Sequence, residues 1–202
     1  MVSGDFLDSG RFETFIDAIL AIMMTVMILK IPQPESLSLG GIWDLRMMYI
    51  AYILSFMVLL SIWNHHRKLF NEIKEIDNIV ILIYMILTFV VTLVPYFTAW
   101  CALNPDKLIP QASYGLIFIL TNILYICAAY FAIKRDKFGD HPNLDMDKST
   151  YLNFIVFFIG FFIAIVFNIP QAIFISCMLS VVIWNFTAKI FSKDKGVGWC
   201  GD

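Results

Sequence analysis

An aspartate lies one turn inside the first long apolar segment of this chain. Asp17 is followed by an apolar run from Ala18 to Leu29 in which Thr25 is the one polar residue. A carboxylate inside a bilayer costs roughly 2.5–3.5 kcal/mol, so it is seldom retained without a partner or a task. Ile22, Thr25 and Leu29 share one stripe of a helix because they are spaced i, i+3 and i+7. The stripe is typical of either a packing seam or a pore lining.

Candidate partners for Asp17 close the second long apolar segment, which ends in Trp63, Asn64, His65, His66 and Arg67. The topology derived below places that end at the membrane depth of Arg11 and Asp17. A carboxylate that hydrogen-bonds an imidazole or a guanidinium is less costly in a membrane than one facing lipid. We expect a partner for Asp17 at this end, with Arg11 assisting, and the sequence leaves open whether it is Asn64, His65 or His66.

Helix geometry predicts that Asp17 points away from Ile22 in the stripe. Five residues separate Asp17 from Ile22, which corresponds to about 140° of rotation beyond a full turn. If Ile22 faces an axis, Asp17 faces the protein interior. This favours a structural latch over an ion site, and a histidine partner would allow the same latch to respond to pH near neutrality.

Other kinds of chemistry are not favoured. His65 and His66 point about 100° apart on a helix and cannot readily share one metal. The four cysteines show no CxxC spacing. The sequence also has no nucleophile elbow, Gly-rich phosphate loop, HExxH motif or TVGYG filter. We expect no enzyme activity, no cofactor and no resident metal.

The composition indicates a polytopic membrane protein. The 202 residues are 60% hydrophobic, against about 45–50% in soluble domains. Mean hydropathy is +0.79. We predict one all-α domain, residues 1–202, because six segments reach the ~17–25 residues that a bilayer core requires. These predicted transmembrane helices are 12–31, 45–64, 79–103, 114–133, 151–167 and 172–191.

Prolines separate and shape these segments. Pro105 and Pro110 are expected to break the third segment from the fourth, and Pro95 to kink the third. The sequence from Asn168 to Gln171 predicts a tight hairpin between the last two, with Pro170 near a helix start.

The basic residues predict the orientation. With both termini cytoplasmic, 11 of the 14 Lys and Arg lie inside, and only Lys30, Arg46 and Lys107 lie outside. The spread of these charges favours anionic lipid over nucleic acid as their partner. Asp5 and Asp8 at the N-terminus, without a positive leading region, argue against a cleaved signal peptide.

The residues around Asp17 resemble the transmembrane protein 175 family of potassium channels, in particular its bacterial single-repeat members. The family signature is an Arg, three spacer residues and Phe-Ser-Asp, followed by an Ala/Ile-rich run with a Thr. Arg11, Phe15 and Asp17 match it, whereas Ile16 replaces the serine, so any hydrogen bond of that serine is missing. The segments from Trp63 to Phe70 and from Leu93 to Thr98 also resemble the family's second and third helices.

The resemblance implies a homotetrameric potassium channel in the plasma membrane or the cell inner membrane. Four copies of the first helix would surround the pore, with an apolar constriction at Ile22 and further layers at Thr25 and Leu29. The permeating K⁺ and membrane lipids would be its other partners. Three alternatives stay open: a proton-coupled transporter that uses Asp17, His65 and His66 as a relay, a small membrane redox subunit, and a non-conducting scaffold.

The predicted topology can be tested with single cysteines in a cysteine-free background. Cysteines at Ser38 and Asp106 should react with an impermeant thiol reagent added outside, and one at Asp145 should not. Labelling of all three from the same side would contradict the topology.

Overall fold

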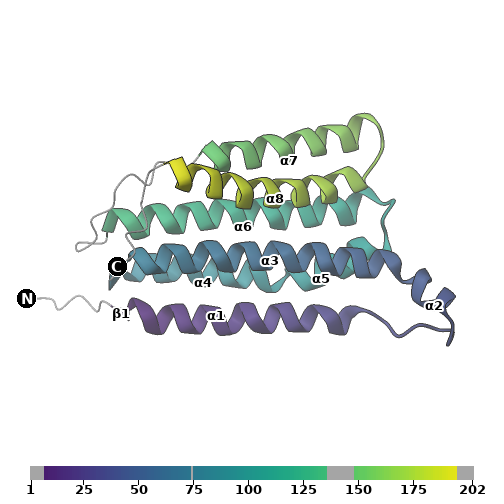
Figure 1. Ribbon diagram of the computed structural model, residues 1–202, viewed down its shortest axis with the longest axis horizontal. Coiled ribbons are helices and arrows are strands. Elements are labelled where there is room, and N and C mark those ends of the chain that lie inside the picture. Colours follow the sequence, from purple (N-terminus) through teal and green to yellow (C-terminus); the bar gives the residue numbers. More distant parts are fainter. Residues whose placement is uncertain (1–6, 74, 136–147, 195–202) are drawn as a thin grey trace, which may run out of the picture.

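The chain folds into a bundle of long helices that lie side by side along one axis (Figure 1). The computed structural model describes residues 7–73, 75–135 and 148–194. The long helices are α1 (Ser9–Val26), α3 (Arg46–Glu72), α4 (Asn78–Thr92), α5 (Val94–Leu103), α6 (Leu108–Arg135), α7 (Lys148–Val166) and α8 (Gln171–Asp194). The 3₁₀ helix η1 (Met27–Lys30) and the short α2 (Leu39–Asp44) connect α1 to α3. The predicted helical architecture is confirmed in the described residues, apart from one short strand pair.

Several of these helices are suited to a bilayer. Within the described residues, four segments are long and apolar enough to cross a membrane: Ser9–Lys30, Arg46–Asn71, Asn78–Leu103 and Leu108–Lys134. Shorter apolar segments, Asn153–Val166 and Gln171–Ile183, lie in α7 and α8. The backbone N–H and C=O groups of a helix bond one another, and this is required in a bilayer because hydrocarbon offers no hydrogen-bond partners. The chain is a multi-pass membrane protein.

The helix ends differ from the bounds of the apolar runs. The first segment is α-helical only to Val26 and then tightens into η1. α3 continues to Glu72, eight residues beyond the expected end at Asn64. α6 begins at Leu108 rather than at Tyr114, so Pro110 lies in its first turn instead of breaking the chain there. A proline is tolerated in a first turn because the N–H that it lacks would have no partner there.

The kink expected at Pro95 is present. α4 ends at Thr92, α5 begins at Val94, and Pro95 lies in the first turn of α5. Buried hydroxyl groups brace the break: the Thr98 hydroxyl is 2.8 Å from Ser55 Oγ on α3, and Ser55 Oγ is 3.1 Å from the Tyr114 hydroxyl on α6. The proline therefore bends the segment where three helices are joined by hydrogen bonds.

A pair of two-residue strands was not expected from the sequence. β1 (Leu7–Asp8) and β2 (Glu75–Ile76) are antiparallel, with Leu7 opposite Ile76 and Asp8 opposite Glu75. The pair ties the residues before α1 to the connection between α3 and α4. Strands this short leave no periodic pattern of side chains in the sequence.

The helices form a layered bundle with α1 at one edge and α7 at the other (Figure 1). α1 packs against α3 and α4, while α7 packs mainly against α8. The expected hairpin between α7 and α8 is present, and Asn168 in its turn has φ 54°, a conformation that asparagine tolerates better than most residues.

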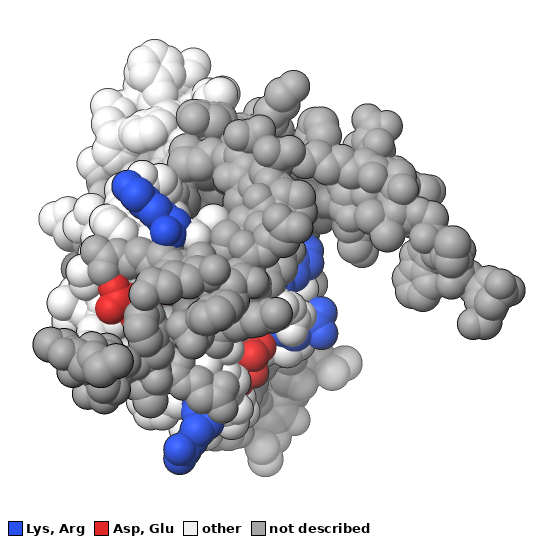
Figure 2. Space-filling model, turned by 90° about the vertical axis from the view of Figure 1, so that its left-hand side faces the viewer, with Lys and Arg blue, Asp and Glu red and all other residues white. Residues whose placement is uncertain are grey.

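Basic side chains lie at both ends of the bundle. Figure 2 views the end at which α1 begins and shows Lys and Arg beside Asp and Glu on that face. Among the side chains that the structure describes, Arg11, Arg67, Lys68 and Lys134 belong to the helix termini at this end, and Lys30, Arg46 and Lys107 to the other.

The contact between α7 and α8 depends on Gly160. A Cβ atom there would lie 2.1 Å from Ser176 Cβ and 2.9 Å from the Ala172 carbonyl oxygen. Gly160→Ala should lower stability by about 1–3 kcal/mol, because the two helices must separate. Thermal unfolding in detergent measures the loss. Gly40→Ala is the control, since its Cβ would meet only the Ser38 hydroxyl at 3.4 Å. Equal midpoints for both variants would contradict the prediction.

Candidate functional site

Asp17 faces α3, and His66 is its histidine partner. The distance from His66 Nε2 to Asp17 Oδ1 is 3.8 Å, longer than a direct hydrogen bond. The His66 side chain is 2% exposed and that of Asp17 37%. The His66 ring also faces the backbone carbonyl of Glu13 on α1. The ring thus lies near two acceptors of α1, the Asp17 carboxylate and the Glu13 carbonyl.

Trp63 and Arg67 act on the same carboxylate. Trp63 provides a hydrogen-bond donor to Asp17, and Arg67 a nearby positive charge. The Arg67 guanidinium carbon lies 5.1 Å from the centroid of the Trp63 ring, a cation–π distance. Trp63, His66 and Arg67, near the end of the second segment, thus lie around Asp17, and the positive charge described beside it is that of Arg67 rather than of Arg11.

The other candidate partners serve different contacts or none that the structure describes. His65 Nδ1 lies 2.8 Å from the Ser61 carbonyl, and the His65 carbonyl accepts a hydrogen bond from the Tyr125 hydroxyl at 3.1 Å. His65 therefore joins α3 to α6. Within the described residues, no contact joins Asn64 or Arg11 to Asp17, and Arg11 is exposed.

Aromatic rings enclose His66, a feature that sequence reasoning missed. The His66 ring centroid is 4.4 Å from that of Phe70 and 5.4 Å from that of Tyr84. Phe12 on α1 completes the cluster, 6.0 Å from Phe70 and 5.9 Å from Tyr84. These residues come from three helices and share no sequence spacing, so only the fold reveals them. Phe15, by contrast, is 47% exposed.

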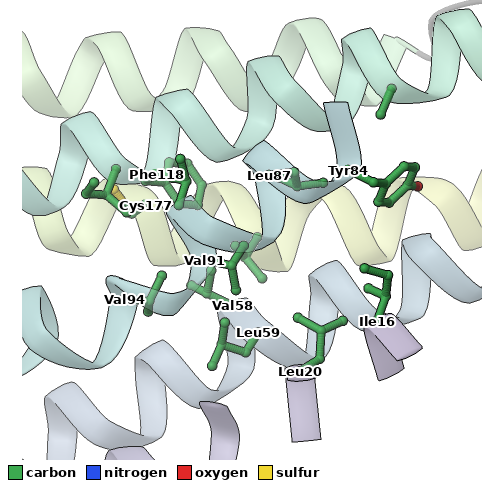
Figure 3. Packing of buried hydrophobic residues seen from close by; sticks show 14 of the residues in the cluster. Ile16, Leu20, Val58, Leu59, Tyr84, Leu87, Val91, Val94, Phe118 and Cys177 are labelled. Atoms are coloured by element: carbon green, nitrogen blue, oxygen red, sulfur yellow. The ribbon is translucent and has the colours of Figure 1, made fainter. Parts of the chain in front are cut away.

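α1 has two distinct faces. Ile16 and Leu20 are 3% and 2% exposed and point into the core, where Figure 3 shows them near Leu59 and Tyr84. Ile22 is 53% exposed on the opposite side, and Thr25 is also exposed. The rotation predicted for Asp17 relative to Ile22 agrees with this arrangement.

Leu29 extends the stripe in a different helical form. It is 78% exposed and belongs to η1 rather than to the α-helix. A 3₁₀ helix turns about 120° per residue instead of about 100°, so Leu29 is rotated by about 60° from its α-helical position. Ile22 and Thr25 remain on one α-helical face, and the Thr25 hydroxyl donates to the Ile22 carbonyl at 2.8 Å.

No alternative chemistry gathers in the part of the chain that the structure describes. There, no three His, Cys, Asp or Glu side chains are grouped as metal ligands would be. The described geometry places Asp17 beside α3 and leaves Ile22 and Thr25 exposed on another face of α1.

Known proteins are similar to this chain in sequence and in fold. Residues 11–95 match the sequence model described as Endosomal/lysosomal potassium channel TMEM175. A potassium channel of Chryseobacterium sp. (strain P1-3) is 28% identical over 192 residues, which cover 93% of this chain and 98% of the relative. The crystal structure of a lysosomal potassium-selective channel TMEM175 homolog from Chamaesiphon minutus shares the fold, with a TM-score of 0.66. It is 22% identical, over 90% of this chain and 97% of that one. Over residues 11–95 the chain is similar to the TMEM175 family.

The TMEM175 family match covers the elements that build the site. Residues 11–95 contain nearly all of α1 together with α3 and α4. The mouse Endosomal/lysosomal proton channel TMEM175 is 32% identical over 103 residues, which make up 48% of this chain but 21% of the mouse protein. The similarity to the longer mouse protein thus concerns one part of it.

Ile16 is the departure of this chain from the TMEM175 signature quoted above. Its side chain is buried, and it borders a cavity together with His66 and Tyr84. The position therefore provides apolar packing beside Asp17, and the described polar contacts of the carboxylate come from Trp63 and His66 of α3.

Asp17→Ala should impair folding and assembly more than ion preference, because the Trp63 donor loses its acceptor and His66 loses the carboxylate that lies 3.8 Å from its Nε2. The loss of stability should be about 1–3 kcal/mol, typical of unsatisfied buried groups. Thermal unfolding and size-exclusion chromatography measure stability and assembly, with Glu35→Ala in the exposed loop as control. A stable assembly with clearly changed ion selectivity would place Asp17 in the pore instead.

Proposed function

We propose that this chain is a potassium-selective channel in which four copies surround a pore lined by α1. The observation that carries the proposal is the exposed stripe of Ile22, Thr25 and Leu29, in which Ile22 lies about 140° around α1 from Asp17. α1 is the least buried of the four long spans: 22% of its most apolar window is buried, against 33–44% for the others. An uncovered helix at the edge of a protomer is available to face other copies.

Small residues on this face favour neighbouring helices over lipid. Ala18, Ala21 and Thr25 are exposed and repeat at helical spacing. Small side chains let membrane helices approach closely, whereas bulky ones suffice against acyl chains. Four α1 helices can therefore pack around a narrow axis, in the closed symmetry that is usual for oligomers.

The remaining helices complete six membrane crossings. α7 and α8 have 19 and 24 residues, so they measure about 28 and 36 Å at 1.5 Å per residue. Both lengths are compatible with a hydrocarbon core of about 30 Å. The bias of basic residues then places both termini in the cytoplasm and the protein in a plasma or inner membrane.

The names of relatives support potassium as the ion. The Chryseobacterium relative is named a potassium channel and matches nearly the whole chain. The Chamaesiphon homolog is titled potassium-selective. Conduction would be passive, because α1 has an exposed stripe that can line a pore.

Ile22 would select potassium by dehydration. A ring of four β-branched side chains is stiff and apolar, so an ion must shed water to pass. Potassium loses water more readily than the smaller, more tightly hydrated sodium ion.

Thr25 offers a second basis for selectivity. Its hydroxyl proton is engaged by the Ile22 carbonyl, which turns the oxygen lone pairs outward as ligands for a cation. Ile22 and Thr25 occupy adjacent layers of the stripe. Selection by dehydration at Ile22 and selection by hydroxyl ligands at Thr25 predict different effects of mutation.

Proton conduction is the second candidate function. The mouse relative carries the name of a proton channel, and Asp17 and His66 are ionisable groups close to the pore helix. Flux of protons and potassium should therefore be measured on the same liposomes.

Ile22→Asn should admit sodium and lower the preference for potassium, because an amide can replace lost water ligands. Ion flux from reconstituted liposomes, with potassium, sodium and a proton gradient as separate arms, measures this. Ile19→Asn is the matched control: Ile19 is only partly exposed and lies about 60° from the stripe.

The outcome distinguishes the two layers. If Ile22→Asn leaves selectivity unchanged and Thr25→Ala abolishes it, a hydroxyl ring is the filter. If the wild-type protein carries protons but no potassium, the potassium proposal is wrong.

A further inference from the structure

A small cavity lies where α1, α3, α4 and α6 meet, behind the face of α1 that carries Asp17. Ile16 and Leu20 line it from α1, His66 from α3, Tyr84 from α4 and Tyr125 from α6. Its volume is about 10 Å³, close to what one water molecule requires. Figure 3 shows Tyr84 and Ile16 at this end of the hydrophobic core.

Polar atoms of two side chains that border the cavity lack partners. Tyr84 is 1% exposed, and within the described part of the chain its hydroxyl has no hydrogen-bond partner. The same holds for both ring nitrogens of His66, which is also 1% exposed. Buried polar groups in native proteins are almost always satisfied, by protein or by ordered water. Two such residues on one cavity of this size therefore point to a ligand.

We propose that this cavity holds one ordered water molecule that bridges Tyr84 and His66. The Tyr84 hydroxyl donates to the water, and the water donates to Nδ1 of His66. Tyr125 also lines the cavity. Its hydroxyl donates to the His65 carbonyl and keeps a lone pair that can accept from the water, which would bring the water to three of the two to four hydrogen bonds that buried waters make. A cavity lined only by apolar groups would remain empty, but this one contains an unpaired donor and an unpaired acceptor.

The water fixes the direction in which His66 donates. The Nε2 side of the ring meets the Asp17 carboxylate at 3.8 Å, and the ring also faces the Glu13 carbonyl. An ionised Asp17 carboxylate only accepts hydrogen bonds, so a neutral ring carries its proton on Nε2, toward that carboxylate, and Nδ1 is left as the acceptor. A water that donates to Nδ1 selects this tautomer, as the second partner of a functional histidine usually does.

Tyr84 is thereby a positioning residue for Asp17, which it does not contact directly. It acts through the water and His66 on the side of α1 that is turned away from the stripe. This inference concerns the interior of one protomer and holds whichever ion the channel conducts.

Tyr84→Phe tests the proposal by the sign of its effect. If the hydroxyl is unpaired, its removal should leave the thermal midpoint unchanged or raise it, because an unsatisfied polar group is lost. If the water bridges Tyr84 to His66, the midpoint should fall by about 2–4 °C. The effect should disappear in a His66→Phe background. Tyr114→Phe is the control for a paired hydroxyl, because Tyr114 is bonded to Ser55, and its effect should not depend on His66.

Solid-state NMR of histidine-¹⁵N-labelled protein in lipid bilayers gives a direct readout. In the wild type, His66 should show an unprotonated Nδ1 and receive magnetisation from water. Tyr84→Phe should weaken that transfer and mix the tautomers, and the signals of His65 should not change. A wild-type His66 without water contact, or with its proton on Nδ1, would overturn the proposal even if the variant failed to fold.

Discussion

The cost of placing a carboxylate inside a membrane governs the arrangement of this bundle. Asp17 lies on a span that is otherwise apolar from Ala18 to Leu29 except for Thr25, and lipid cannot satisfy it. The donors that meet it come from one end of α3, so α1 can present only one side to that helix. These contacts fix the rotation of α1 about its own axis, and this rotation determines which face of α1 the rest of the protomer leaves exposed.

The aromatic cluster makes this rotation specific. Phe12, Phe70 and Tyr84 surround His66 from three helices and keep the imidazole from turning. Closely packed rings fit together in only a few arrangements. A small rotation of α1 would therefore break several of these contacts at once. The polar contacts of Asp17 and the aromatic packing thus both fix the rotation of α1 about its own axis.

Much of the architecture could be predicted from the sequence, because membrane spans are long apolar runs that prolines and polar residues separate. The apolar runs, the kink at Pro95 and the hairpin near Asn168 are local properties, and each appears in the structure. The helix ends were less predictable: α3 reaches Glu72 because polar residues also continue a helix once it leaves the hydrocarbon. The switch to 3₁₀ geometry at Met27 has no signal in an unbroken run of apolar residues.

The candidate site was predictable in its depth but not in its partners. Sequence spacing places Asn64, His65 and His66 at one level, yet a difference of one residue on a helix is a rotation of about 100°. That rotation sends His65 toward α6 and His66 toward α1. Tyr84 could not be found in advance, because its contact with His66 depends on how α4 packs between α1 and α6.

The pairing of β1 with β2 has a consequence for position along the membrane normal. The strand pair joins the chain just before Ser9 to the segment just after α3. A helix held only by side chains can slip lengthwise by one turn, about 5.4 Å, and find similar neighbours. The backbone hydrogen bonds of the strand pair, just before α1, prevent this lengthwise slip. They therefore fix the depth of each α1 residue in the membrane.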